Sequence, residues 1–142
     1  MSFFSHFAHP HWPNLSLIAQ VPLVIQIHLM AALAAFAIAT FQILGPKGTT
    51  LHRTLGWIWV LFMGTVAISS LWIKLINRGH FSVIHILSLV TLVALPILVY
   101  AARTHKVDLH KRTARNLYLG ALIGAGVFTF FPGRLMWQIF FG

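Results

Sequence analysis

Four apolar stretches of the chain are each close to the length that crosses a lipid bilayer. They occupy approximately residues 22–44, 55–76, 81–102 and 116–131, and short connections rich in glycine and basic residues separate them. A bilayer core about 30 Å thick needs ~20 apolar residues per helix. Short connections favour antiparallel neighbours. We therefore predict an all-α integral membrane protein that folds as a four-helix up-down-up-down bundle.

The chain is predicted to hold one transmembrane domain, residues 22–142, preceded by an outer tail, residues 1–21. The fourth apolar stretch ends before Pro132-Gly133, and we expect the aromatic segment after it to lie in the membrane interface. The first twenty residues contain no lysine or arginine, so they lack the basic start of a secretory signal. No cleaved targeting peptide is expected.

Composition excludes several classes of site. Charged residues make up 8% of the chain, against about 25% in soluble domains. The absence of cysteine excludes disulfides, iron–sulfur clusters and thiolate zinc sites. Asp108 is the single acidic residue, so the membrane segments have no carboxylate for a cation pump or a cation-selective ring.

The net charge of +9 comes from lysines and arginines that flank the apolar stretches, mostly in the first and third connections. By the positive-inside rule these connections face the cytoplasm, so both termini face away from it, in a bacterial inner membrane. We expect contact with anionic lipid at the inner face. The basic residues do not form one stripe, so nucleic-acid binding is not expected.

Four histidines fall at two depths of the predicted bundle. His28 and His85 lie in the outer parts of the first and third helices, while His52 and His110 immediately precede the second and fourth helices on the inner side. In the predicted topology these are pairs on diagonal helices, and two imidazoles on facing helices can ligate a haem b. The pattern predicts one or two bis-histidine haems. The outer pair is the stronger candidate, because histidine is costly inside the membrane.

The neighbouring residues admit this interpretation and a plainer one. Arg53, Lys111 and Arg112 are placed to bind the propionates of an inner haem, and Arg134 those of an outer one. Small residues share a helical face with His28 and would let a macrocycle approach, although such a face is more often a helix-packing seam. A separate plain interpretation is that His52 and His110 are ordinary interfacial residues in basic loops that bind lipid phosphate. The small residues on the helical face of His28 are Ala31, Ala32, Ala35 and Ala39.

The spacing of the histidines suggests an internal duplication. His28 and His85 are 57 positions apart, and His52 and His110 are 58 apart. Each half consists of an apolar helix, a basic loop, a histidine and a second helix. We predict a duplicated two-helix hairpin with a pseudo-two-fold axis along the membrane normal. The remaining histidine cluster of the tail could bind a divalent metal, but no acid or cysteine completes the site, so a flexible tail is favoured. It comprises His6, His9 and His11.

Three strings of the sequence resemble a bacterial family of predicted four-helix membrane proteins of unknown function. They read GPKGTTLHRTLGWIWV, GHFSVIHILSL and LHKRTARNLYLGALIGAGVFTFFPGRLMW, and the resemblance runs from His28 to Gly142. A small departure is Thr113-Ala114-Arg115, where the family has a methionine. In pattern only, the four histidines are similar to those of di-haem transmembrane b-type cytochromes, which move electrons from ascorbate or quinol.

The leading functional hypothesis is therefore a membrane b-type cytochrome that transfers electrons through one or two haems. The chain shows no nucleophile or acid–base pair, so any membrane oxidoreductase activity would belong to the haem edge and a quinol or soluble reductant. Two alternatives stay open. One is a haem-free accessory or structural subunit of a larger membrane complex, and the other is a histidine-lined protein that binds a metal or a quinone.

Overall fold

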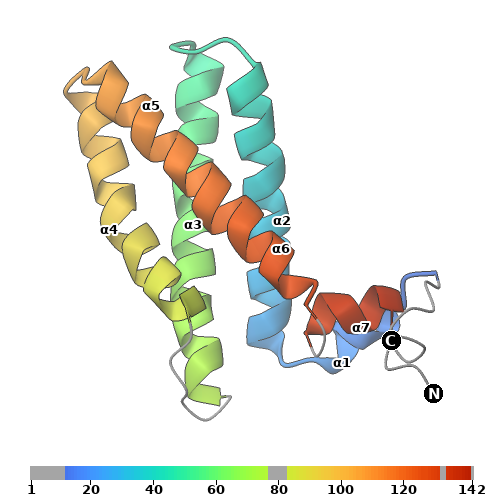
Figure 1. Cartoon of the computed structure of the whole chain (residues 1–142). Coiled ribbons are helices and arrows are strands. Elements are labelled where there is room, and N and C mark those ends of the chain that lie inside the picture. Colours follow the sequence, from blue (N-terminus) through green and yellow to red (C-terminus); the bar gives the residue numbers. More distant parts are fainter. Residues whose placement is uncertain (1–11, 77–82, 132–133, 142) are drawn as a thin grey trace, which may run out of the picture.

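The computed structural model describes residues 12–76, 83–131 and 134–141, and all regular secondary structure within these ranges is helical (Figure 1). The elements in chain order are α1 Ser16–Gln20, α2 Leu23–Leu44, α3 Thr50–Ile76, α4 Val83–Arg103, α5 Val107–Asn116, the π-helix η2 Leu117–Gly124, α6 Ala125–Thr129 and α7 Leu135–Phe141.

Three of these helices are long and apolar enough to cross a membrane. The apolar spans are Leu23–Leu44 in α2, Thr50–Ile73 in α3 and His85–Arg103 in α4. Large apolar side chains cover their outward faces, which only a lipid environment would accommodate at this density. The described part of the chain is thus all-helical and contains three helices that are long and apolar enough to cross a membrane, which suggests a membrane protein.

The fourth predicted helix begins earlier than the sequence indicated. Helices α5, η2 and α6 form one uninterrupted helical stretch from Val107 to Thr129, because the residues at both junctions keep right-handed helical backbone angles. Residues 107–115 were expected in a basic loop. Apolarity marks only the part of a helix that meets lipid, and lysine and arginine are themselves good helix formers.

Helix α3 also begins earlier than expected, at Thr50 and not at 55. The hydroxyl of Thr49 accepts a hydrogen bond from the backbone N–H of His52 (3.1 Å), which caps the free donors of the first turn. His52 and His110 therefore lie inside helices and not in the connections before them. Their side chains are held by helical backbone at the inner end of the molecule.

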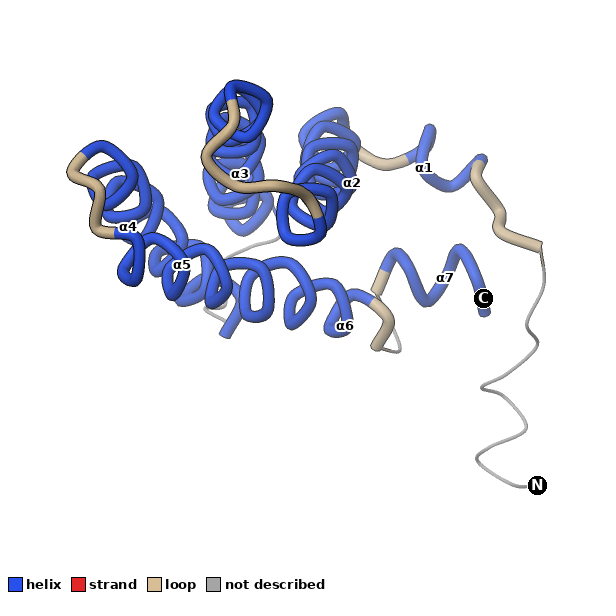
Figure 2. The backbone as a smooth tube through the Cα atoms, turned by 90° about the horizontal axis from the view of Figure 1, so that it is seen from above, coloured by secondary structure: helices blue, strands red, loops and turns tan. Residues whose placement is uncertain are grey.

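Helices α4, α3 and α2 lie side by side, and the described helices do not form a regular four-helix bundle. Helix α3 packs against α2 on one side and α4 on the other, and the stretch from α5 to α6 packs first on α4 and then, through η2, on α2. Figures 1 and 2 show this last stretch crossing the other helices obliquely. The eight-residue π-helix gives it a wider turn where it reaches α2.

The core lies where small residues of α2 meet large ones of α3. Ala35 and Ala39 are buried against Trp59 and Met63. The indole N–H of Trp59 donates a hydrogen bond to the carbonyl of Ala35 (3.1 Å). The alanine face of α2 is therefore a helix-packing seam, which is the plainer of the two interpretations that the sequence allowed.

The two short terminal helices lie at one end of the molecule (Figure 1). The backbone N–H of Asn14, just before α1, donates a hydrogen bond to the carbonyl of Ile139 in α7 (3.0 Å), and the side chain of Ile139 is buried. Part of the segment that the sequence assigned to a tail is thus ordered against α7. The expected interfacial position of the α7 aromatic residues stays a prediction.

Candidate functional site

Two of the four histidines form a direct pair at the end of the molecule that holds the 45–49 and 104–106 connections, which the sequence predicts to lie on the inner side. His52 in the first turn of α3 and His110 in the first turn of α5 are both partly buried. Their ring centres are 6.3 Å apart, and the ring planes are inclined at 71°. The fold therefore brings together two imidazoles that are distant in sequence, from two helices that α4 separates along the chain.

The hydrogen bond of His110 fixes which of its nitrogens is protonated. Nδ1 lies 3.3 Å from the backbone carbonyl oxygen of Leu98 in α4. A carbonyl oxygen only accepts, so Nδ1 carries the hydrogen and donates it. In the neutral ring Nε2 then has a lone pair. A histidine that donates from Nδ1 to a carbonyl and keeps a lone pair on Nε2 is in the usual form of a metal ligand.

His52 has an unsatisfied nitrogen. Within the described part of the chain its Nδ1 is buried and has no hydrogen-bond partner. The backbone around it is firmly held, because the side-chain amide of Gln42 donates to the His52 carbonyl oxygen (2.8 Å). A buried polar atom without a partner destabilises a fold by about 1–3 kcal/mol. The position of His52 thus calls for a partner that the neighbouring side chains do not supply.

The ring-centre distance of the pair matches that of two imidazoles that ligate one metal ion from opposite sides. An imidazole nitrogen binds a transition metal at about 2.0–2.1 Å and lies about 1.1 Å from its ring centre, so ligands on opposite sides of one metal have ring centres about 6.3 Å apart. Such rings can turn about their common axis, so an inclination of 71° is compatible with ligation. Two neutral imidazoles are also the donor set of a low-spin haem iron. The same geometry suits an edge-to-face ring contact.

Cationic residues are next to the pair in sequence. Arg53 follows His52 directly, Lys111 and Arg112 follow His110, and all three are exposed. The guanidinium of Arg103 lies over the ring of Trp57 at 5.9 Å from its centre. This inner end can bind anionic groups such as carboxylates or lipid phosphates.

The outer histidines are placed differently. Nδ1 of His28 lies 3.1 Å from the carbonyl oxygen of Val66 and 2.9 Å from the hydroxyl of Ser69, so its ring is anchored to α3. His85 lies near the start of α4 and is partly buried. The sequence favoured the outer pair, whereas the pair with an observed ring-to-ring geometry is the inner one. Arg134, expected near an outer haem, has its guanidinium 4.5 Å from the ring centre of Phe128.

Two polar residues that contact the histidines were not predicted from the sequence. Gln42 contacts His52, and Ser69 contacts His28. Both are polar residues within apolar spans, and that signal alone could have marked them. The Leu98 carbonyl has no signature in sequence. The predicted tail cluster of His6, His9 and His11 lies outside the described residues.

No protein-family model, curated protein or solved structure matches the chain. The resemblance to a four-helix membrane family therefore stays a prediction.

Proposed function

We propose that the protein is an integral membrane b-type cytochrome in which His52 and His110 ligate a haem at the inner end of the bundle. The observation that carries the proposal is the pairing of the two imidazoles at a ring-centre distance of 6.3 Å. The bare Nε2 of His110 and the unpartnered Nδ1 of His52 add to it, because both call for a partner between or beside the rings.

The residues around the pair have distinct roles in this proposal. The Leu98 carbonyl orients His110, and the amide of Gln42 holds the backbone of His52. Arg53, Lys111 and Arg112 bind the two propionates, which need cations near the membrane surface. A bound haem supplies one-electron chemistry, and the protein sets its position and its electrostatic surroundings.

A second haem between His28 and His85, with Arg134 near its propionates, belongs to the same proposal. The version with the inner haem alone has the better support, because the rings of His52 and His110 lie against each other with their centres 6.3 Å apart. Electrons would pass across or into the membrane, to or from a quinol, a soluble reductant or another membrane subunit.

We further propose that the helical stretch Val107–Thr129 is the fourth crossing of an up-down-up-down bundle. Its second half is apolar, and its first half carries the basic residues expected at a cytoplasmic surface. Both termini then face away from the cytoplasm of a bacterial inner membrane, while the cationic end contacts anionic lipid. The neighbouring positions of α1 and α7 support a common side for the termini.

The test is the absorption spectrum of the detergent-purified protein, made with ample haem available, before and after reduction with dithionite. We expect a Soret peak, with α and β bands that sharpen on reduction. His52→Ala and His110→Ala should each abolish the inner-haem signal. His105→Asn is the matched control, because His105 is exposed and has a positive φ of 58°, which asparagine tolerates.

A folded, colourless protein would overturn the haem proposal and favour a haem-free accessory subunit. Elemental analysis of the same sample distinguishes a third case. A stoichiometric transition metal that is lost in both histidine variants, without a Soret band, would identify the pair as a simple metal site.

A further inference from the structure

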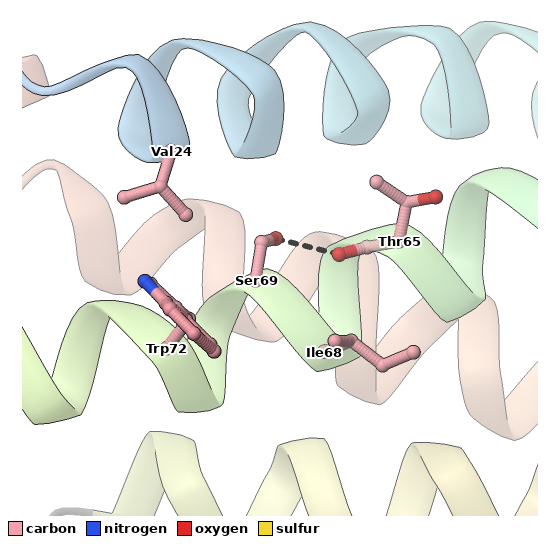
Figure 3. Close-up of a pocket in the computed structure, with 5 residues that line it drawn as sticks. All are labelled: Val24, Thr65, Ile68, Ser69 and Trp72. Carbon is pink, nitrogen blue, oxygen red and sulfur yellow. Dashed lines mark hydrogen bonds between the residues drawn. The ribbon is translucent and has the colours of Figure 1, made fainter.

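A groove opens between α2 and α3 near the outer end of the molecule, away from the His52–His110 pair. It has a volume of about 310 Å³ and is open on one side. Figure 3 shows Val24 of α2 facing Ser69 and Trp72 of α3 across it. The walls are mostly apolar, and Ile68 and Trp72 are largely exposed on a membrane-spanning helix. A ligand would therefore enter from the lipid.

Both hydroxyl groups of the groove already donate their hydrogen to backbone carbonyls of α3. Thr65 donates to the carbonyl of Leu61 (2.9 Å), and Ser69 donates to the carbonyl of Thr65 (2.6 Å), a bond drawn in Figure 3. A hydroxyl oxygen that donates its only hydrogen can still accept. The groove thus presents hydrogen-bond acceptors to a ligand, and a matching ligand must carry donors.

Ser69 also links the groove to His28. Because Nδ1 of His28 donates to the carbonyl of Val66, its neutral ring has a lone pair on Nε2. The Ser69 hydroxyl oxygen, 2.9 Å from the same Nδ1, also accepts this hydrogen, which leaves it one lone pair for a ligand. An ionisable residue within a membrane span, attached to the wall of a lipid-open groove, is a second and independent indication of a ligand site.

We propose that this groove binds the ring of a lipid-soluble quinol. A hydroquinone ring is flat, so it can lie against the indole of Trp72. Its O–H groups are donors for the oxygens of Ser69 and Thr65, while its isoprenoid tail remains among the lipids. The oxidised quinone has carbonyls that only accept, so it lacks the complementary donors. The site therefore prefers the reduced form.

The quinol site is separate from the proposed inner haem site. Ser69 follows His52 by 17 positions in α3, which corresponds to about 25 Å along a helix with a rise of 1.5 Å per residue. Binding of the quinol does not require haem, so the two proposals can fail separately.

The experiment measures the affinity of decylubiquinol and of decylubiquinone for the full chain in lipid nanodiscs, by calorimetry. We expect the quinol to bind about tenfold more tightly than the quinone. Ser69→Ala should weaken quinol binding about fivefold to tenfold, as for the loss of one hydrogen bond, and should change quinone binding little. Val24→Phe, which fills the groove, should abolish both. Ser70→Ala is the matched control, since Ser70 is buried next to Ser69 but bonds Ser88 of α4.

Unfolding temperatures of all variants show whether a loss of binding reflects loss of the fold, and Ser69→Thr should restore quinol affinity. Equal affinity for the two redox forms, binding that survives Val24→Phe, or no binding at all would overturn the inference. A haem-containing protein that binds no quinol refutes this site alone. A colourless protein that binds quinol through Ser69 refutes the haem proposal alone.

Discussion

The imidazole rings of His52 and His110 lie 6.3 Å apart, centre to centre, although 58 positions separate the two residues in the chain. The contact depends on two features of the fold. Helix α3 starts early enough to include His52, and α5 extends the fourth helical stretch back to include His110. Both histidines are therefore fixed by helical backbone, which is the rigid support that a ligand pair requires.

The unpartnered nitrogen of His52 predicts opposite effects of one substitution in the haem-free and haem-bound protein. In haem-free protein, His52→Leu removes a buried nitrogen that has no hydrogen-bond partner, and we expect stabilisation by about 1 kcal/mol. In protein made with haem, the same change should destabilise by removing a ligand. Thermal unfolding in detergent, with and without haem supply, measures both. His110→Leu is the contrast, because it breaks the bond to Leu98 and should destabilise both forms.

Gln42 is predicted to act as a positioning residue for the same site. Its amide donates to the carbonyl of His52 at 2.8 Å. Gln42→Leu keeps the apolar stem but removes this bond, and we expect about a tenfold loss of haem affinity, as is common for residues that orient a ligand. Haem titration followed at the Soret band measures the change. Gln138→Leu, on the exposed side of α7, should leave the affinity unaltered.

A hydroxyl pair couples the π-helix to α2. The hydroxyl of Tyr118 in η2 lies 3.1 Å from the hydroxyl of Thr40 in α2. The ring of Tyr118 stacks on that of Phe36, with 5.8 Å between the ring centres. Hydrogen bonds between membrane helices contribute about 0.6 kcal/mol on average. A double-mutant cycle of Tyr118→Phe and Thr40→Val, read by reversible unfolding in mixed micelles, should give a coupling energy of that size. A coupling of zero would mean that stacking alone holds η2 on α2.

The alanine seam predicts a sharp positional difference along α2. Ala35 has no exposed surface and accepts the Trp59 bond, whereas Ala37 is exposed on the same helix. Ala35→Leu should push α3 away and destabilise the fold by about 1–3 kcal/mol, as overpacking does. Ala37→Leu should change the unfolding free energy by less than about 0.5 kcal/mol, because its side chain meets lipid. Similar losses at both positions would contradict the observed packing.

The length of the first apolar stretch predicted both ends of α2 to within one residue, because the apolar residues and the helix cover the same part of the chain there. It failed at Thr50 and Val107, where capping and helix propensity extend the helices through polar residues beyond the apolar part. The sequence placed His52 and His110 at the same end of the fold, but it did not predict the direct contact of their rings. That contact depends on the oblique course of α5 and on the Leu98 carbonyl, which cannot be recognised from residue types.

The charge distribution predicts the side of the membrane on which each connection lies, and the absence of cysteine makes the test clean. Single cysteines can be placed at exposed positions without background labelling. Pro46→Cys and Thr104→Cys lie in the basic connections, while Gln20→Cys and Gln138→Cys lie in α1 and α7. In bacterial spheroplasts, a membrane-impermeant maleimide should label only the last two, because basic connections stay in the cytoplasm. Permeabilised cells should show labelling at all four, which confirms that each thiol is reactive. Labelling of Thr104→Cys and Gln138→Cys from the same side would contradict a fourth crossing by Val107–Thr129.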